Sequence, residues 1–190
     1  LAGYTANANV GEVFVAPGPF AGGDFNADSA GVIILAGPGS PEGKLARYLA
    51  VADVTGDSTA DILTGNGCCR RAINVWAGGA DLGGAADVVI DAPDGSANFN
   101  EIDEYSLCDI DGDGKSELLS GNASSVSGYV WFGGAGFGGE PDRTYSPGSG
   151  INANATGYVH GVCMPDFTGD GTPDIAFIAR SGAGTVTIRH

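Results

Sequence analysis

Short apolar runs separated by turn-forming residues recur along the whole chain. Valine, isoleucine, leucine and aromatic residues gather at 32–36, 73–76, 88–90 and 129–132, and stretches with glycine or proline lie between these runs. Runs of this length fit β-strands, and the residues between them favour tight turns. The 3.6-residue period of an amphipathic helix is missing, so the pattern predicts an all-β chain. Because the runs are far shorter than a membrane-spanning helix, we expect no transmembrane segment.

A nine-residue acidic motif occurs three times at nearly constant spacing. Its copies occupy residues 53–61, 109–117 and 166–174, so their starts are 56 and 57 residues apart. One apolar stretch follows each copy directly, and a second comes after a short gap. Four short strands in a period of this length correspond to one blade of a β-propeller. The sequence therefore predicts tandem four-stranded antiparallel blades, of which about three and a half are present.

The repeats divide the chain into four parts. Residues 1–49 form a degenerate first repeat, 50–105 the second repeat, 106–162 the third and 163–190 a partial fourth. Together they make one repeat domain or part of a larger propeller. A blade buries its faces only against neighbouring blades. We therefore expect completion by the remainder of a longer chain or by self-association, and self-association without ring closure gives a filament.

Oxygen-bearing side chains occupy alternate positions of the acidic motif. Ca²⁺ takes six to eight oxygen ligands from a flexible loop. Side chains at positions 1, 3, 5 and 9 and the backbone carbonyl at position 7 are the predicted ligands, and glycine at position 4 permits a sharp turn. The ligand residues are Asp53, Thr55, Asp57, Thr59 and Asp61; Asp109, Asp111, Asp113, Lys115 and Glu117; and Asp166, Thr168, Asp170, Thr172 and Asp174.

These ligand sets predict about three Ca²⁺ ions in a structural role, because the protein supplies all the ligands. The loop with four acids, 109–117, is expected to bind most tightly, since the other two carry threonine at position 3. The alternative is that the acids only form turns, which Asp and Gly favour in any case. Three clusters of carboxylates without a counter-ion make that alternative the weaker one.

The charge balance narrows the classes of partner. Asp and Glu number 23 against 8 Lys and Arg, which gives a net charge of -15. Such a surface repels the phosphates of nucleic acids and suits cations, so we expect no nucleic-acid partner. The two histidines, His160 and His190, lie near no nucleophile motif. Acids closed around a calcium ion are poor general bases, so we expect no enzymatic activity.

Four cysteines make a disulfide the expected state. Cys68, Cys69, Cys108 and Cys163 contain no C-x-x-C pair, so a zinc ribbon is not expected. In an oxidising compartment such residues form disulfides, and we expect at least one between neighbouring repeats. Four cysteines allow three pairings, and the sequence does not choose among them. Free buried thiols remain the alternative.

Several short motifs resemble the FG-GAP repeats of the integrin alpha-subunit propeller and its bacterial relatives. The resemblance rests on the acidic motif, on Gly-Gly-Ala at 78–80 and 133–135, and on Phe132 before the second of these tripeptides. It covers most of residues 50–190 and, weakly, 1–49. It implies a seven-bladed propeller with calcium in several blades, placed extracellularly, as a secreted or cell-surface protein, with a role in adhesion or ligand binding.

The resemblance and the loops together favour an extracellular calcium-binding module for adhesion or assembly. Its partner is then a protein or glycan outside the cell. A structural subunit of an extracellular filament or matrix is the first alternative, and a carbohydrate-binding propeller lectin is the second. In a lectin, Trp76 and Trp131 would stack on a sugar, whereas we expect both to pack in the core.

Overall fold

The computed structural model describes residues 2–4, 11–19, 31–36, 48–65, 72–93, 105–122, 127–145, 158–180 and 185–189. Within these ranges the regular structure is entirely β-strand. The strands are β1 (Ala2–Tyr4), β2 (Gly11–Val15), β3 (Ile33–Ala36), β4 (Tyr48–Ala52), β5 (Asp61–Gly65), β6 (Ile73–Trp76), β7 (Val88–Ile90), β8 (Ser106–Cys108), β9 (Glu117–Asn122), β10 (Ser127–Trp131), β11 (Arg143–Tyr145), β12 (Tyr158–Met164), β13 (Asp174–Arg180) and β14 (Thr185–Arg189). The prediction of an all-β chain is confirmed for this part of the molecule.

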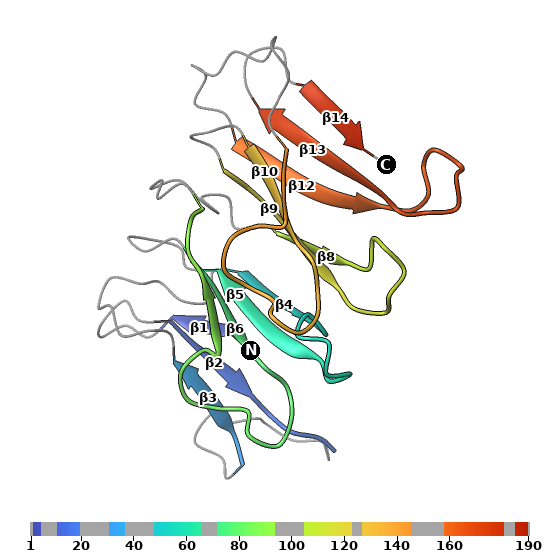
Figure 1. The fold of residues 1–190 in the computed structure, drawn as a ribbon. Helices are drawn as coiled ribbons and strands as arrows, with labels where there is room; N and C mark the ends of the chain where they lie inside the picture. The colour runs from blue at the N-terminus through green and yellow to red at the C-terminus, as the bar shows by residue number, and fades with distance from the viewer. Residues whose placement is uncertain are drawn as a thin grey trace.

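The strands form four antiparallel sheets in which each strand pairs with the next in sequence. The sheets contain β1–β3, β4–β7, β8–β11 and β12–β14, and the two middle sheets have four strands each. Figure 1 shows the sheets following one another, with the N-terminal sheet and the C-terminal sheet at opposite ends of the molecule. The predicted four-stranded antiparallel unit is therefore confirmed in the two middle sheets.

Each acidic motif connects the first strand of a unit to the second. Strand β4 leads into 53–61, β8 into 109–117 and β12 into 166–174, and the last acid of each motif begins the following strand. In the first two of these units the residue directly before the motif pairs with that last acid, whereas in the last unit Pro165 stands between the paired residue and the motif. The pairs are Ala52 with Asp61, Cys108 with Glu117 and Met164 with Asp174. The sequence repeat is thus a structural repeat.

Two tryptophans fill equivalent places in the core. Trp76 in β6 and Trp131 in β10 are fully buried. Their indole N–H groups donate hydrogen bonds to the carbonyl oxygens of Gly84 at 3.1 Å and Gly139 at 3.0 Å, so the polar atom of each ring is satisfied. The predicted core role is confirmed, and neither ring is exposed to stack on a sugar.

Neighbouring sheets pack through apolar side chains. Val54, Leu63 and Ile73 of the second unit share a buried cluster with Leu118 and Trp131 of the third. Backbone hydrogen bonds join the same two units. The amide of Ser116 donates to the Asp53 carbonyl, and that of Gly134 donates to the Val54 carbonyl, both at 2.8 Å. The loops 53–61 and 109–117 are therefore in direct contact.

A disulfide links the third and fourth sheets. Cys108 at the end of β8 bonds Cys163 in β12, with 6.3 Å between the Cα atoms and a sequence separation of 55 residues. The Ser106 hydroxyl donates a hydrogen bond to the Gly161 carbonyl at 2.9 Å beside it. The other two candidates, Cys68 and Cys69, lie outside the described residues. The disulfide therefore connects the strands that lead into two successive acidic loops.

Among the described residues there is no helix whose length and apolarity would let it cross a bilayer.

Removing the disulfide tests its contribution to stability. Closing a chain segment of this length restricts the unfolded state, so the double variant Cys108→Ser/Cys163→Ser should lose about 2–5 kcal/mol of unfolding free energy. Urea denaturation of the variant and the wild type, both under non-reducing conditions, measures the difference. The double variant leaves Cys68 and Cys69 unchanged, which isolates this bond. Equal stability of the two proteins would contradict the prediction.

Alkaline pH tests the burial of Tyr105, which packs edge-on against Tyr48 with ring centroids 4.9 Å apart. Burial raises the pKa of Tyr105 above its usual 10.0, and Tyr48 adds to the effect. The unfolded chain therefore ionises first, so the stabilising contribution of neutral Tyr105 is complete below pH 10 and is lost above it.

Relative to Tyr105→Phe, the wild type should lose about 1 kcal/mol of stability between pH 10 and 11. Denaturation curves at several pH values measure the difference. Parallel pH profiles for the two proteins would refute the assignment.

Candidate metal centre

The first acid of each motif organises the loop backbone. Both oxygens of the Asp109 carboxylate accept backbone hydrogen bonds, Oδ1 from Gly112 at 2.7 Å and from Asp113 at 3.1 Å, and Oδ2 from Gly114 at 2.9 Å. Asp53 and Asp166 accept bonds from the corresponding amides of their own loops. Each of these acids therefore holds its loop in a tight curve, as Asx turns do.

Glycine at position 4 supplies the sharp turn that the sequence predicts. Gly56, Gly112 and Gly169 have φ values of 78°, 78° and 79°, in the left-handed region that side chains with a Cβ disfavour. Position 6 is left-handed as well, and there the loops differ. It holds glycine in two loops but Ser58 in the loop 53–61, with φ of 70°. The loop 53–61 therefore carries backbone strain that the other two avoid.

The last acid of each motif is fully buried. Asp61, Glu117 and Asp174 have no exposed surface. Asp61 Oδ2 accepts hydrogen bonds from the amides of Val54 and Thr55, both at 2.8 Å, and Oδ1 accepts one from Gly78 at 2.9 Å. Glu117 makes two of these three connections in the next unit. It accepts a bond from Ile110 at 2.6 Å and one from Gly133 at 3.2 Å.

These bonds explain the glycine that begins each Gly-Gly-Ala tripeptide. The amide of Gly133 must reach the buried Glu117 carboxylate, which brings its Cα close to the preceding loop. A Cβ at this position would lie 2.8 Å from the Ser116 carbonyl oxygen and 2.9 Å from the Cβ of Lys115. A side chain would therefore push the tripeptide away from the acid. Sequence reasoning found the tripeptide but missed this role, which depends on the pairing of β9 with β10.

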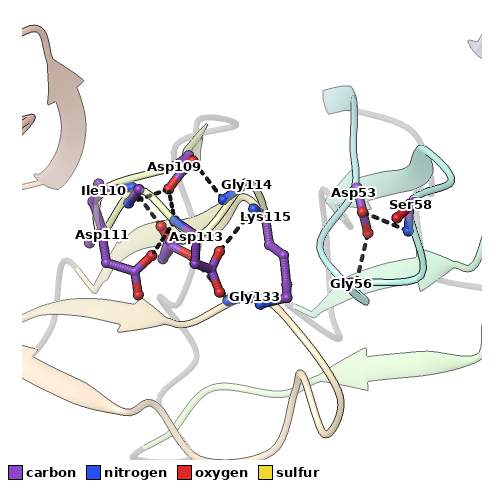
Figure 2. A network of polar contacts seen from close by, with 12 residues as sticks. Asp53, Gly56, Ser58, Asp109, Ile110, Asp111, Asp113, Gly114, Lys115 and Gly133 are labelled. Carbon is purple, nitrogen blue, oxygen red and sulfur yellow. Dashed lines mark hydrogen bonds and ion pairs between the residues drawn. The ribbon is translucent and has the colours of Figure 1, made fainter.

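Three carboxylates converge in the loop 109–117. Asp109, Asp111 and Glu117 each offer an oxygen, and these oxygens lie within 4.8 Å of one another. Oxygens bound to one Ca²⁺ at 2.3–2.6 Å are at most about 5 Å apart, so the group fits a calcium ion. Figure 2 shows Asp109, Asp111 and Asp113 around the loop, with the Asp53 loop beside it. No other group of three acidic, histidine or cysteine ligands is found in the ranges that the structure describes.

The other two loops place a hydroxyl where Asp111 stands. Thr55 Oγ1 donates to Asp61 Oδ1 at 3.3 Å, and Thr168 Oγ1 donates to Asp174 Oδ1 at 3.4 Å. Positions 3 and 9 are thus neighbours in all three loops. What differs is charge, because only the middle loop has a carboxylate at both positions. The ligand sets of 53–61 and 166–174 stay predictions.

Position 5 is turned toward position 7 in each loop. Asp57 Oδ1 accepts a hydrogen bond from the Thr59 amide at 2.7 Å, and Asp170 Oδ1 accepts one from the Thr172 amide at 3.0 Å. In the middle loop Asp113 accepts the Lys115 amide at 2.9 Å, and it also forms an ion pair with the Lys115 ammonium. Asp113 therefore lies in the loop but outside the group of three converging carboxylates.

Burial and repulsion act on Glu117. Desolvation raises the pKa of the Glu117 carboxyl, and the charges of Asp111 and Asp109 raise it further. The hydrogen bonds from Ile110 and Gly133 oppose these effects without cancelling them. A cation among the three carboxylates would supply the opposite charge that Glu117 lacks.

The comparison with protein families matches part of the chain. The model of the FG-GAP-like repeat matches residues 109–177, from the first acid of one motif to the strand that follows the next. The resemblance found in the sequence is thereby confirmed for this segment, which is an FG-GAP-like repeat. A comparison with curated proteins returned no match.

Strain at Ser58 gives a prediction for the loop 53–61. The left-handed conformation destabilises a residue that has a Cβ by about 1–2 kcal/mol. Glycine avoids this strain, but part of the gain is offset because glycine also makes the unfolded chain more flexible. Ser58→Gly should therefore raise the unfolding free energy by about 1 kcal/mol, whereas the control Ser58→Ala keeps the Cβ and should bring no gain. Thermal unfolding of the three proteins measures both effects. A gain in the alanine variant equal to that in the glycine variant would show that strain is not the cause.

Proposed function

We propose that this chain is a calcium-binding module of β-propeller type that works outside the cell in adhesion or assembly. The observation that carries the proposal is the convergence of Asp109, Asp111 and Glu117 in a loop that belongs to an FG-GAP-like repeat. Such repeats are typical of extracellular adhesion modules. The bond between Cys108 and Cys163 supports the same location, because disulfides persist in oxidising compartments.

The sheets are proposed to be successive propeller blades. Each sheet is an antiparallel meander, and its apolar side chains pack against those of the next sheet in sequence. The acidic loops occupy the same place in three units, between the first and second strands. This is the organisation expected of a repeat architecture in which each unit contacts only its neighbours.

In the middle loop the ion would be held by one oxygen from each of Asp109, Asp111 and Glu117. The backbone carbonyl of Lys115 is the further ligand that the motif offers. A bound Ca²⁺ supplies two positive charges to three carboxylates that repel one another. The role proposed is structural, since Glu117 also ties the loop to Gly133 of the next hairpin. The same role is proposed for the loops 53–61 and 166–174.

The proposal includes no catalytic role. The carboxylates of the loops accept hydrogen bonds from backbone amides, which fixes them as structural acceptors. The partner is proposed to be a protein or glycan outside the cell. With a net charge of -15, a partner surface that carries cations is favoured over an anionic one.

Removing calcium tests the proposed function. Calcium binds the folded loops and not the unfolded chain. At a free calcium concentration about 100 times the dissociation constant, one site therefore adds about 2.7 kcal/mol to the unfolding free energy. Thermal unfolding in calcium and in EGTA should therefore differ clearly. Asp111→Asn should shrink the calcium-dependent shift, whereas Glu140→Gln, an exposed acid outside the loops, should leave it unchanged. An identical melting curve in EGTA, with metal removal confirmed, would overturn the proposal.

A further inference from the structure

Lys115 occupies a position that differs chemically between the loops. At position 7 the other two motifs carry Thr59 and Thr172. The Thr172 hydroxyl donates a hydrogen bond to Asp170 Oδ1 at 2.7 Å, so a neutral donor faces the position-5 acid there. In the middle loop an ammonium group faces the equivalent acid, Asp113. Position 7 thus carries a charge only in the middle loop.

The stem of Lys115 is fixed by the neighbouring repeat. A Cβ built on Gly56 would lie 2.7 Å from Lys115 Cδ, and one built on Gly134 would lie 3.4 Å from the same atom. The methylene chain therefore packs along the backbone of both glycines, and Figure 2 shows it on the side of the loop that faces the Asp53 loop. With the stem held there, the ammonium forms its ion pair with Asp113 at the surface of the loop.

The ammonium also lies in the field of the converging carboxylates. The ammonium donates a hydrogen bond to Asp113, and the charges of Asp111 and Glu117 also attract it. Two of the carboxylates that attract the ammonium, Asp111 and Glu117, are the ones that would hold the metal ion. A metal ion and Lys115 therefore draw on the same negative charge.

We propose that Lys115 is a tethered counter-ion that competes with Ca²⁺ for the loop 109–117 and sets the affinity of that site. Without metal it neutralises Asp113 and holds this acid apart from the other three. When a divalent cation binds, the ammonium is repelled and Asp113 is released to serve as a further ligand. This inference rests on the proposed calcium site. It also changes the order of calcium affinity expected from the number of acids. The loop 109–117 has four acids, but the Lys115 charge offsets part of their attraction for the ion.

Two substitutions separate the charge of Lys115 from its packing. Lys115→Met keeps a long apolar stem over Gly56 and removes the charge, whereas Lys115→Arg keeps the charge. Removing one positive charge close to a divalent ion should tighten Ca²⁺ binding at this loop about three- to ten-fold. The arginine variant should stay near the wild type. Lys115→Thr, which copies the other two loops, should behave as the methionine variant does.

Calcium titration calorimetry on the full chain measures the effect, and a double-mutant cycle with Asp111→Asn assigns it to the middle loop. In the Asp111→Asn background the methionine substitution should change affinity much less. Because the ion pair is exposed, salt should screen it. The advantage of the methionine variant should therefore shrink between about 50 mM and about 500 mM salt.

The outcomes distinguish the two proposals. A wild type that binds calcium, with Lys115→Met and Lys115→Thr equal to it or weaker, overturns the counter-ion role and leaves the calcium site standing. A gain in affinity that is independent of salt, or that appears equally in Lys115→Arg, also overturns it, since packing would then be the cause. If neither the wild type nor any variant binds calcium, the proposed function fails and the counter-ion role fails with it.

Discussion

In each repeat, the acidic loop and the segments next to it depend on the buried carboxylate at the end of that loop. Taking a carboxylate out of water is costly unless hydrogen bonds replace its hydration. Asp61 and Glu117 meet this requirement with amides from the start of their own loops and from the glycine after the next strand pair. One side chain thereby fixes the path of the loop, the start of a strand and the position of the following tripeptide.

Contact between successive units follows from the same constraint. The loop 109–117 and the tripeptide at 133–135 are held together, so their amides face the previous unit side by side. The amides of Ser116 and Gly134 donate hydrogen bonds to the carbonyls of Asp53 and Val54 in that unit. Apolar side chains from both sheets pack beneath these bonds. The acidic loops are therefore part of the interface between units as well as candidate metal sites.

The sequence predicted the features that depend on local pattern. Spacing and residue type located the three loops, the strands that follow them and the buried positions of Trp76 and Trp131. The sequence did not show which cysteines pair, because that depends on which strands lie side by side, and the fold places β8 beside β12. The sequence also assigned Lys115 by its carbonyl alone, since the direction of its side chain is set by Gly56 and Gly134, which are distant in sequence. The features that were missed are thus those decided by contacts between residues far apart in the sequence, within a unit or between units.

The disulfide has a mechanical consequence under the proposed adhesive role. A pulling force applied along the chain passes from Cys108 to Cys163 through the covalent bond, which bypasses a segment with a sequence separation of 55 residues. Strands β9, β10 and β11 lie inside that bypassed segment, together with the loop 109–117. Extension of the molecule therefore leaves these three strands and the acidic loop off the load path, whereas β8, which ends at Cys108, stays on it. Strands β9, β10 and β11 therefore keep their pairing while the chain outside the bond stretches.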